Sequence, residues 1–128
     1  MHAKNGEPVA LRAINRTRDT ILCERLQNAG GLRGQSRGLL GRDGLGDGEG
    51  MLFINGRFNP FMWMHMFFMK FAIDIVFLDG RDRVIGIDRE LKPWRVSSIA
   101  LGARKALEIQ AGATRRALTE IGDQIEFR

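Results

Sequence analysis

The stretch Met64-His65-Met66-Phe67-Phe68-Met69-Lys70-Phe71-Ala72-Ile73-Asp74-Ile75-Val76-Phe77-Leu78-Asp79-Gly80 decides the fold of this 128-residue chain. It is the most apolar part of the sequence, and a glycine-containing turn joins it to a second strand-like run, Arg83–Asp88. No other segment can supply the middle of a hydrophobic core. The same stretch carries three polar side chains, those of His65, Lys70 and Asp74, among aromatic residues and methionines.

This stretch predicts a buried strand followed by a β-hairpin. Phe61–Phe71 is apolar on both alternating faces, which is typical of a central strand covered on each side. Ala72–Leu78 and Arg83–Asp88 form the hairpin, and Gly80 is expected to supply the positive φ that the turn needs. Since side chains alternate along a strand, the register assigns two faces to the first arm. Those faces are Ile73, Ile75 and Phe77 on one side, and Asp74, Val76 and Leu78 on the other.

The rest of the chain predicts shorter elements around the hairpin. Asn28 is expected to cap a first helix reaching Leu40, weakened by glycines that each cost about 1 kcal/mol relative to alanine. The glycine-rich segment Gly41–Gly50 reads as a connecting loop with Leu45 as its apolar anchor, because it lacks the order of a phosphate-binding or EF-hand loop. The other expected elements are strands at Thr20–Leu26, Met51–Ile54, Ala103–Gln110 and Gln124–Arg128, and a second helix at Ala113–Leu118.

These elements favour an α+β, β-rich fold. We expect a loose N-terminal arm at residues 1–16, with a short extended piece near Val9–Ile14, and a single compact domain at residues 17–128. The order of strands and helices predicts a small barrel or a curled, mostly antiparallel sheet with two short helices.

Composition excludes several classes of protein. The only cysteine, Cys23, permits no internal disulfide and no CxxC motif, so a cytoplasmic, soluble protein is expected. The first seven residues lack the apolar core of a signal peptide. Lys70 and Asp74 interrupt the long apolar run, and a charge at mid-bilayer costs about 2.5–3.5 kcal/mol, so no membrane span is expected. The net charge of +5 comes without an aromatic-and-basic motif, so nucleic acid is not an expected partner.

Six motifs in the same order resemble the family of domains of unknown function 192 (DUF192), also called uncharacterised protein family 0127 (UPF0127). The resemblance runs from about Leu22 to the C-terminus and implies a compact, β-rich, bacterial-type domain to which no biochemical activity is assigned. The chain departs from the family at Ala72, where relatives usually carry proline, and at residues 28–31, where the usual helix start is missing. The motifs are Arg37–Arg42, Glu49–Phe53, His65–Met69 with Ile73–Asp79, Leu91–Arg95, Leu107–Gly112 and Ile121–Asp123.

Several polar or aromatic side chains are candidates for ligand binding. Asp74 lies between two isoleucines, where a carboxylate needs an arginine, a turn of backbone N–H groups or a ligand. Trp94 follows Pro93 and is either a lid over the barrel mouth or a core plug. His65 is either a site residue or a core histidine bonded to backbone. The candidates are His65, Met69, Asp74, Lys92, Trp94 and Arg95; the cationic ones, with Lys70, either line an anion site or form a solvated face.

Metal binding and nucleophilic catalysis have weaker support. Methionines are soft ligands suited to Cu(I), but Met62, Met64 and Met66 share one strand face while His65 and Met69 share the other. One ion cannot collect both sets, so no metal and no cofactor are expected. Cys23 and His65, oriented by Asp74, form the only thiol–imidazole combination.

The sequence therefore favours a non-enzymatic binding module with a pocket near the barrel mouth for a small polar or anionic ligand or a peptide. The alternative is a small hydrolase- or transferase-like enzyme using His65 and Asp74 as acid/base groups, and a third is nucleic-acid association through the arginines. At least two of His65, Asp74, Lys92 and Trp94 are expected to line one cleft, with Trp94 in its wall. The sequence carries no signal for the oligomeric state.

Overall fold

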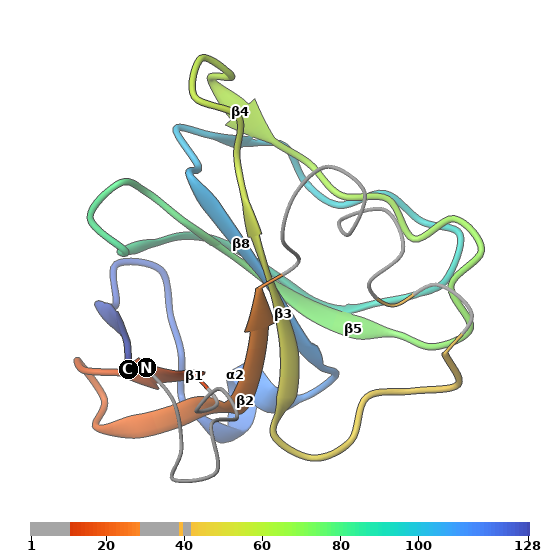
Figure 1. Cartoon of the computed structure of the whole chain (residues 1–128), viewed down its shortest axis with the longest axis horizontal. Helices are drawn as coiled ribbons and strands as arrows, with labels where there is room; N and C mark the ends of the chain where they lie inside the picture. Colours follow the sequence, from red (N-terminus) through yellow and green to blue (C-terminus); the bar gives the residue numbers. More distant parts are fainter. Residues whose placement is uncertain (1–10, 29–38, 40–41) are drawn as a thin grey trace, which may run out of the picture.

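The computed structural model describes residues 11–28, 39 and 42–128, and these residues form two sheets and one short helix (Figure 1). A seven-stranded sheet has the order β6-β5-β8-β3-β2-β1-β9, and a two-stranded sheet pairs β4 with β7. The elements are β1 (Leu11–Asn15), β2 (Thr20–Asn28), β3 (Glu49–Ile54), β4 (Phe61–Met62), β5 (Ile73–Leu78), β6 (Val84–Leu91), β7 (Ala100–Leu101), β8 (Lys105–Gln110), α2 (Ala113–Arg116) and β9 (Ile125–Phe127).

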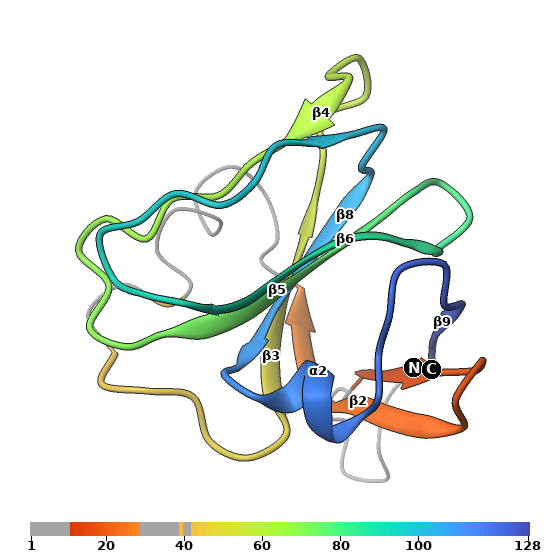
Figure 2. The same cartoon turned by 180° about the vertical axis from the view of Figure 1, so that it is seen from behind.

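The large sheet is a curled half-barrel, as Figures 1 and 2 show from opposite sides. Its strands pair antiparallel except β2 and β3, which run parallel. The curl brings the start of edge strand β6 against the segment before the other edge strand, β9: Arg83 bridges to Gln124, and Val84 N donates to Asp123 O at 2.9 Å. The expected β-rich, curled and mostly antiparallel sheet is confirmed.

The predicted hairpin is the centre of the fold. Every residue of β5 is buried, and its two faces enter two separate hydrophobic clusters. The first cluster takes Ile73, Ile75 and Phe77, and the second takes Val76 and Leu78, as the alternation predicted. Full burial of one such side chain is worth about 1.5–3 kcal/mol. A slip of one residue would move every side chain of β5 to the opposite cluster and lose a large part of this packing energy.

The hairpin turn uses aspartates where the sequence suggested a glycine. The positive φ falls on Asp82, at 61°, and Gly80 is not among the positive-φ residues. Asp79 Oδ1 accepts from the N–H groups of Arg81 and Arg83, at 2.8 and 3.0 Å, and closes the turn. Aspartate tolerates the left-handed region because its short polar side chain bonds locally, so the expectation for Gly80 is wrong while the turn itself is confirmed.

The predicted central strand at Phe61–Phe71 is wrong. Only Phe61–Met62 is a strand, β4, and it pairs with β7 outside the large sheet. Residues 63–72 are irregular, and they alternate between buried and exposed positions: Met66 is buried, while Trp63 and Phe67 are exposed. A run that is apolar on both faces looks the same in sequence whether one face or both are covered, so the pattern could not reveal the open face.

Two further expectations need correction. The described residues contain one helix, α2, so two short helices are not confirmed, and most of the predicted first helix lies outside the described residues. Asn28, its expected cap, ends β2 instead and pairs with Leu52. β1 pairs with both β2 and β9, so part of the expected loose arm belongs to the sheet, whereas residues 1–10 lie outside the described residues. No described helix is long and apolar enough to cross a membrane.

The side chain of Asp74 joins three elements, β5, β6 and α2. Its side chain is fully buried on the face of β5 opposite to Ile73 and Ile75. Oδ1 accepts from Glu90 N at 2.8 Å and Gly112 N at 3.1 Å, while Oδ2 accepts from Thr114 N at 3.0 Å and Thr114 Oγ1 at 2.6 Å. Of the partners that the sequence left open, the backbone N–H groups are the ones found. The carboxylate therefore holds β6 and the start of α2 against β5.

Replacing Asp74 by asparagine should lower the free energy of unfolding by about 3 kcal/mol, because the new amide N–H would face buried donors that only an acceptor can satisfy. Chemical denaturation of the variant and the wild type measures this difference. Asp79→Asn is the matched control, since Asp79 also accepts two backbone N–H groups but in an exposed turn, and it should lose less than about 1 kcal/mol. Equal losses in the two variants would contradict the structural role of Asp74.

Candidate ligand-binding surface

Five rings form a continuous exposed strip, called here the aromatic surface: Trp63, His65, Phe67, Phe68 and Trp94. His65 stacks on Phe67 with centroids 4.8 Å apart, and Phe68 contacts Trp94 at the same distance. Steps of 6.3 Å link Trp63 to His65 and Phe67 to Trp94. The side chain of Phe68 is 70% exposed and that of Trp94 59%. Contiguous exposed rings are unusual, and they more often mark an interaction site than contribute to stability.

Two tight turns carry three of these rings, those of Phe67, Phe68 and Trp94. One spans residues 66–69 and the other residues 92–95, and each is closed by a backbone bond from its fourth to its first residue, at 3.2 and 3.3 Å. The third residues are Phe68 and Trp94, with φ of 65° and 68°. A type II turn favours glycine at this position, and Pro93 stands where such a turn favours proline. Since a left-handed φ costs a bulky residue about 1–2 kcal/mol, both turns hold a solvent-exposed ring at the expense of stability.

The two turns are fastened to each other and to the core. Met66 N donates to Arg95 O, and Trp94 N donates to Met66 O, both at 2.7 Å. Met64 and Ser97 exchange two further bonds, at 2.8 Å each. Met66 and Met69 are buried in the first hydrophobic cluster beneath the rings. The aromatic surface is thus positioned by a hydrogen-bonded frame, which lowers the entropy cost of binding a ligand.

The segments that build the aromatic surface also carry positive charge and further apolar side chains. Lys92 and Arg95 are exposed in the second turn, and Lys70, just after the first turn, lies 3.6 Å from Asp43. The exposed aliphatic residues Val96, Ile99 and Leu101 follow in the same chain segment. An apolar patch with a cationic rim is typical of a protein or peptide interface.

The structure brings together four of the six sequence-predicted residues. His65, Lys92, Trp94 and Arg95 lie on the two hydrogen-bonded segments, and His65 pairs with Val96 through an isolated bridge. His65 and Trp94 share an exposed surface, so Trp94 is not a core plug and His65 is not a core histidine. Met69, in contrast, is a buried core methionine, on the opposite side of the segment from where the strand pattern placed it.

The acid/base and thiol combinations do not form. Asp74 lies on the face of β5 opposite to the methionines beneath the aromatic surface, and both of its oxygens accept hydrogen bonds from elsewhere. Cys23 is buried in the second cluster, its Sγ donates to Gly48 O at 3.2 Å, and burial raises its pKa to about 11. A thiol with that pKa stays protonated at neutral pH and is a poor nucleophile. Within the described part of the chain, no three His, Cys, Asp or Glu residues are grouped as a metal site requires.

Several arginines that produce the positive net charge have partners within the fold. Arg16 pairs with Glu126, Arg18 with Asp123 and Arg42 with Glu49, at 3.0 to 3.2 Å. Arg104 donates to backbone carbonyls of residues 56, 57 and 59. These contacts hold loops and turns in place.

Glu108 is a site candidate that sequence reasoning missed. It lies on β8 between Met51 of β3 and Ile75 of β5, on the face shared with Ala106, and is 6% exposed. Burial raises the pKa of its carboxyl to about 7, and no described residue donates a hydrogen bond to it. Its alternation with Leu107 and Ile109 is typical of a residue on the solvent face of a strand, so the sequence contained no signal of burial.

The sequence matches a known protein family over most of its length. The model of DUF192, described as an uncharacterized ACR, matches residues 13–127. The chain belongs to the DUF192 family. A UPF0127 protein from Thermococcus sibiricus is 38% identical over 64 residues, which are 50% of this chain and 41% of that protein. Another, from Pyrococcus abyssi, is 32% identical over 83 residues, covering 62% of this chain and 68% of the relative. The match thus spans less than half of the Thermococcus relative.

Two crystal structures share the fold. A protein of unknown function from Novosphingobium aromaticivorans superposes with a TM-score of 0.79 and 26% identity, over 98% of this chain and 90% of that one. A proposed transcription regulator from Sinorhizobium meliloti gives 0.77 and 22%, over 95% and 98%. The second likeness, at its low identity, concerns the fold alone. DUF192 membership and the β-rich fold expected from the sequence motifs are both confirmed.

Glu108→Gln should stabilise the protein at alkaline pH. The folded carboxyl keeps its proton up to about pH 7, whereas the unfolded one releases it near 4.5, so stability falls as pH rises through that window. Glutamine cannot ionise, so the variant should gain up to about 3 kcal/mol at pH 8 and almost nothing at pH 4. Denaturation at both pH values measures the gain. Glu24→Gln, at an exposed position, is the control, and its stability at pH 8 should lie within about 0.5 kcal/mol of the wild type.

Phe68→Gly should leave the free energy of unfolding unchanged within about 1 kcal/mol. Relief of the left-handed strain offsets the greater chain entropy of glycine, and the ring is mostly exposed. Phe77→Ala, which empties a fully buried site, should lose about 3–5 kcal/mol in the same denaturation experiment. A comparable loss in Phe68→Gly would mean that this ring belongs to the core.

Proposed function

We propose that this DUF192 protein is a non-enzymatic binding module whose aromatic surface takes an extended, acidic peptide segment. The observation that carries the proposal is the pair of turns in which Phe68 and Trp94 hold strained backbone conformations while their exposed rings touch. Strain of this kind persists where the surrounding structure enforces it, and it clusters at functional sites.

The spacing of the rings supports a peptide ligand. Successive rings of the aromatic surface lie 4.8 to 6.3 Å apart. Side chains on one face of an extended peptide repeat about every 6.6 Å, because each residue rises about 3.3 Å. An extended segment can therefore set alternate side chains against successive rings. Rigid aromatic anchors of this type carry much of the binding energy at peptide and protein interfaces.

The charge around the rings supports an acidic segment. Lys70, Lys92 and Arg95 belong to or adjoin the two turns, and the whole chain carries a net charge of +5. Complementary charge raises the rate of association and suppresses wrong partners. The same charge opposes pairing of two copies of this chain through the aromatic surface.

The intrinsic fluorescence of the protein provides a local assay. Its two tryptophans are Trp63 and Trp94, both on the aromatic surface, and the chain has no tyrosine. The probe is a peptide of alternating leucine and glutamate, with an alternating leucine–lysine peptide of equal length as the charge control. We expect a saturable change in tryptophan fluorescence with the glutamate peptide and no such change with the lysine peptide.

Phe68→Gly should weaken binding of the glutamate peptide by about tenfold or more, the effect of losing one anchor residue, and it retains both tryptophans. Phe58→Ala is the matched control, because Phe58 is 89% exposed but is not part of the aromatic surface. Equal weakening in both variants, equal binding of the lysine peptide, or a stable homodimer in sedimentation experiments that Phe68→Gly dissociates would each overturn the proposal.

A further inference from the structure

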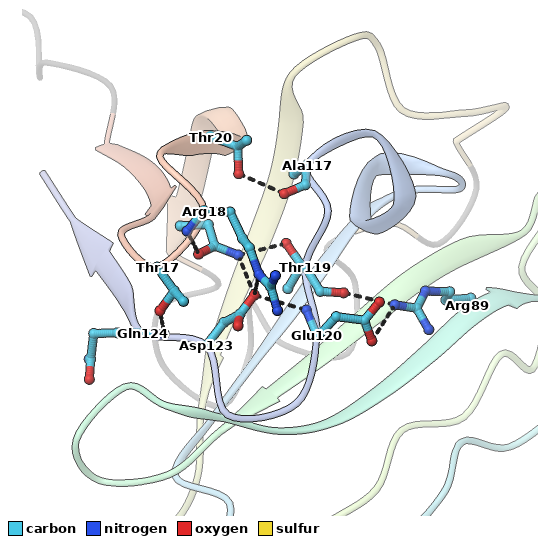
Figure 3. Close-up of polar contacts among 10 residues, drawn as sticks. Thr17, Arg18, Thr20, Arg89, Ala117, Thr119, Glu120, Asp123 and Gln124 are labelled. Atoms are coloured by element: carbon cyan, nitrogen blue, oxygen red, sulfur yellow. Dashed lines mark hydrogen bonds and ion pairs between the residues drawn. The ribbon is translucent and has the colours of Figure 1, made fainter.

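A second candidate site lies apart from the aromatic surface, on the side of the half-barrel that carries α2. Here the β1–β2 turn, the end of β6 and the α2 segment enclose a hollow of about 450 Å³. Figure 3 shows the polar contacts of this region, with Arg18 and Arg89 on either side of Glu120. The hollow is lined by Arg18, Arg89, Thr114, Arg115, Leu118 and Glu120.

Arg18 is held by a buried carboxylate. Its Nε donates to Asp123 Oδ2 at 3.0 Å, and Asp123 also accepts from Asn15 Nδ2 and Glu120 N, at 2.9 Å each. Burial raises the pKa of Asp123, but the three bonds together outweigh it and lower that pKa below its ordinary value. The bond to Asp123 raises the pKa of Arg18, so both groups stay charged. The two terminal nitrogens of Arg18 have no hydrogen-bond acceptor among the described residues. The guanidinium is thus fixed at one edge and open at the other.

Arg89 is held in the same way by α2 and the segment after it. Its Nε donates to Thr114 Oγ1 at 3.2 Å, and Nη2 donates to Thr119 O at 2.8 Å. Thr114 in turn donates to the buried Asp74, so two successive hydrogen bonds connect Arg89 to that carboxylate. No described residue accepts a hydrogen bond from Nη1, and the carboxylate of Glu120 lies 3.6 Å from Nη2.

Arg115 completes the set. It is exposed, and no hydrogen bond or ion pair to a described residue engages its guanidinium. Three arginines thus line one hollow with a single carboxylate, that of Glu120. Asp123 is not among the lining residues, and its Oδ2 accepts three hydrogen bonds, from Asn15, Arg18 and Glu120. The uncommitted guanidinium N–H groups are the donors that match a tetrahedral oxyanion, which accepts paired hydrogen bonds.

We propose that this arginine-lined hollow is a binding site for a phosphate-type oxyanion, either inorganic phosphate or the phosphate group of a monoester. Arg18 and Arg89 are pre-organised by their buried partners, so the anion does not have to order them. Arg115 adds the third cation, and Glu120 is the group that the anion displaces from Arg89. The inference is independent of peptide binding at the aromatic surface.

Binding is measured with inorganic phosphate by calorimetry and by backbone and arginine side-chain NMR shifts, in a phosphate-free buffer at constant ionic strength. Arg115→Gln should weaken phosphate binding by about tenfold, the effect of one lost charged contact. Arg116→Gln is the matched control: it removes the same charge from the same helix, but Arg116 donates to Gln110 and lines a different hollow. It should leave the affinity unchanged.

Glu120→Gln gives a test in the opposite direction, because removal of the competing carboxylate should tighten phosphate binding several-fold. Glycerol phosphate as a second probe distinguishes the two sources: comparable affinity indicates a monoester, and much weaker affinity indicates free phosphate. Shifts confined to residues 114–120, Arg18 and Arg89 support the site. Equal weakening by Arg115→Gln and Arg116→Gln, or no binding of either probe, would overturn it. Phe68→Gly should not alter this affinity, so the two proposals fail separately.

Discussion

The carboxylate of Asp74 is the constraint on which the rest of the structure depends. A buried charge is tolerated only where donors surround it, and Asp74 collects them from the end of β6, from Gly112 and from Thr114. The positive φ of Glu90, at 53°, belongs to the irregular pairing that aims one of these N–H groups inward. Through Thr114 the same network reaches Arg89, so one carboxylate positions both the helix and the side chains beyond it.

The alternation of β5 separates the chemistry of the protein into two regions. On one face, methionines and isoleucines support the segment that carries the aromatic surface. On the other face, Asp74 and the second cluster support the arginine-lined hollow. This separation is why His65 and Asp74, nine positions apart in the most informative stretch of the sequence, cannot act on one substrate atom. It also allows an apolar surface and a cationic hollow to exist without sharing residues.

Sequence reasoning succeeded where a local rule determines the outcome. The hairpin of β5 and β6 was predictable together with the two faces of β5, because side chains alternate along a strand. It failed where the outcome depends on what covers a face. Phe67 and Phe68 belong to an apolar run that looks buried but is open, and Glu108 occupies a position that looks exposed but is covered.

The sequence by itself determined the β-rich class, the hairpin and the family, because side-chain alternation and ordered motifs are properties of the linear chain. It also brought His65 and Trp94 forward as candidates. Only the tertiary structure decided that the ring of Phe67 links those of His65 and Trp94 on one surface, and that Arg18, Arg89 and Arg115 line one hollow. The physical reason is that such contacts join residues far apart in the chain, and the curl of the sheet sets their distances.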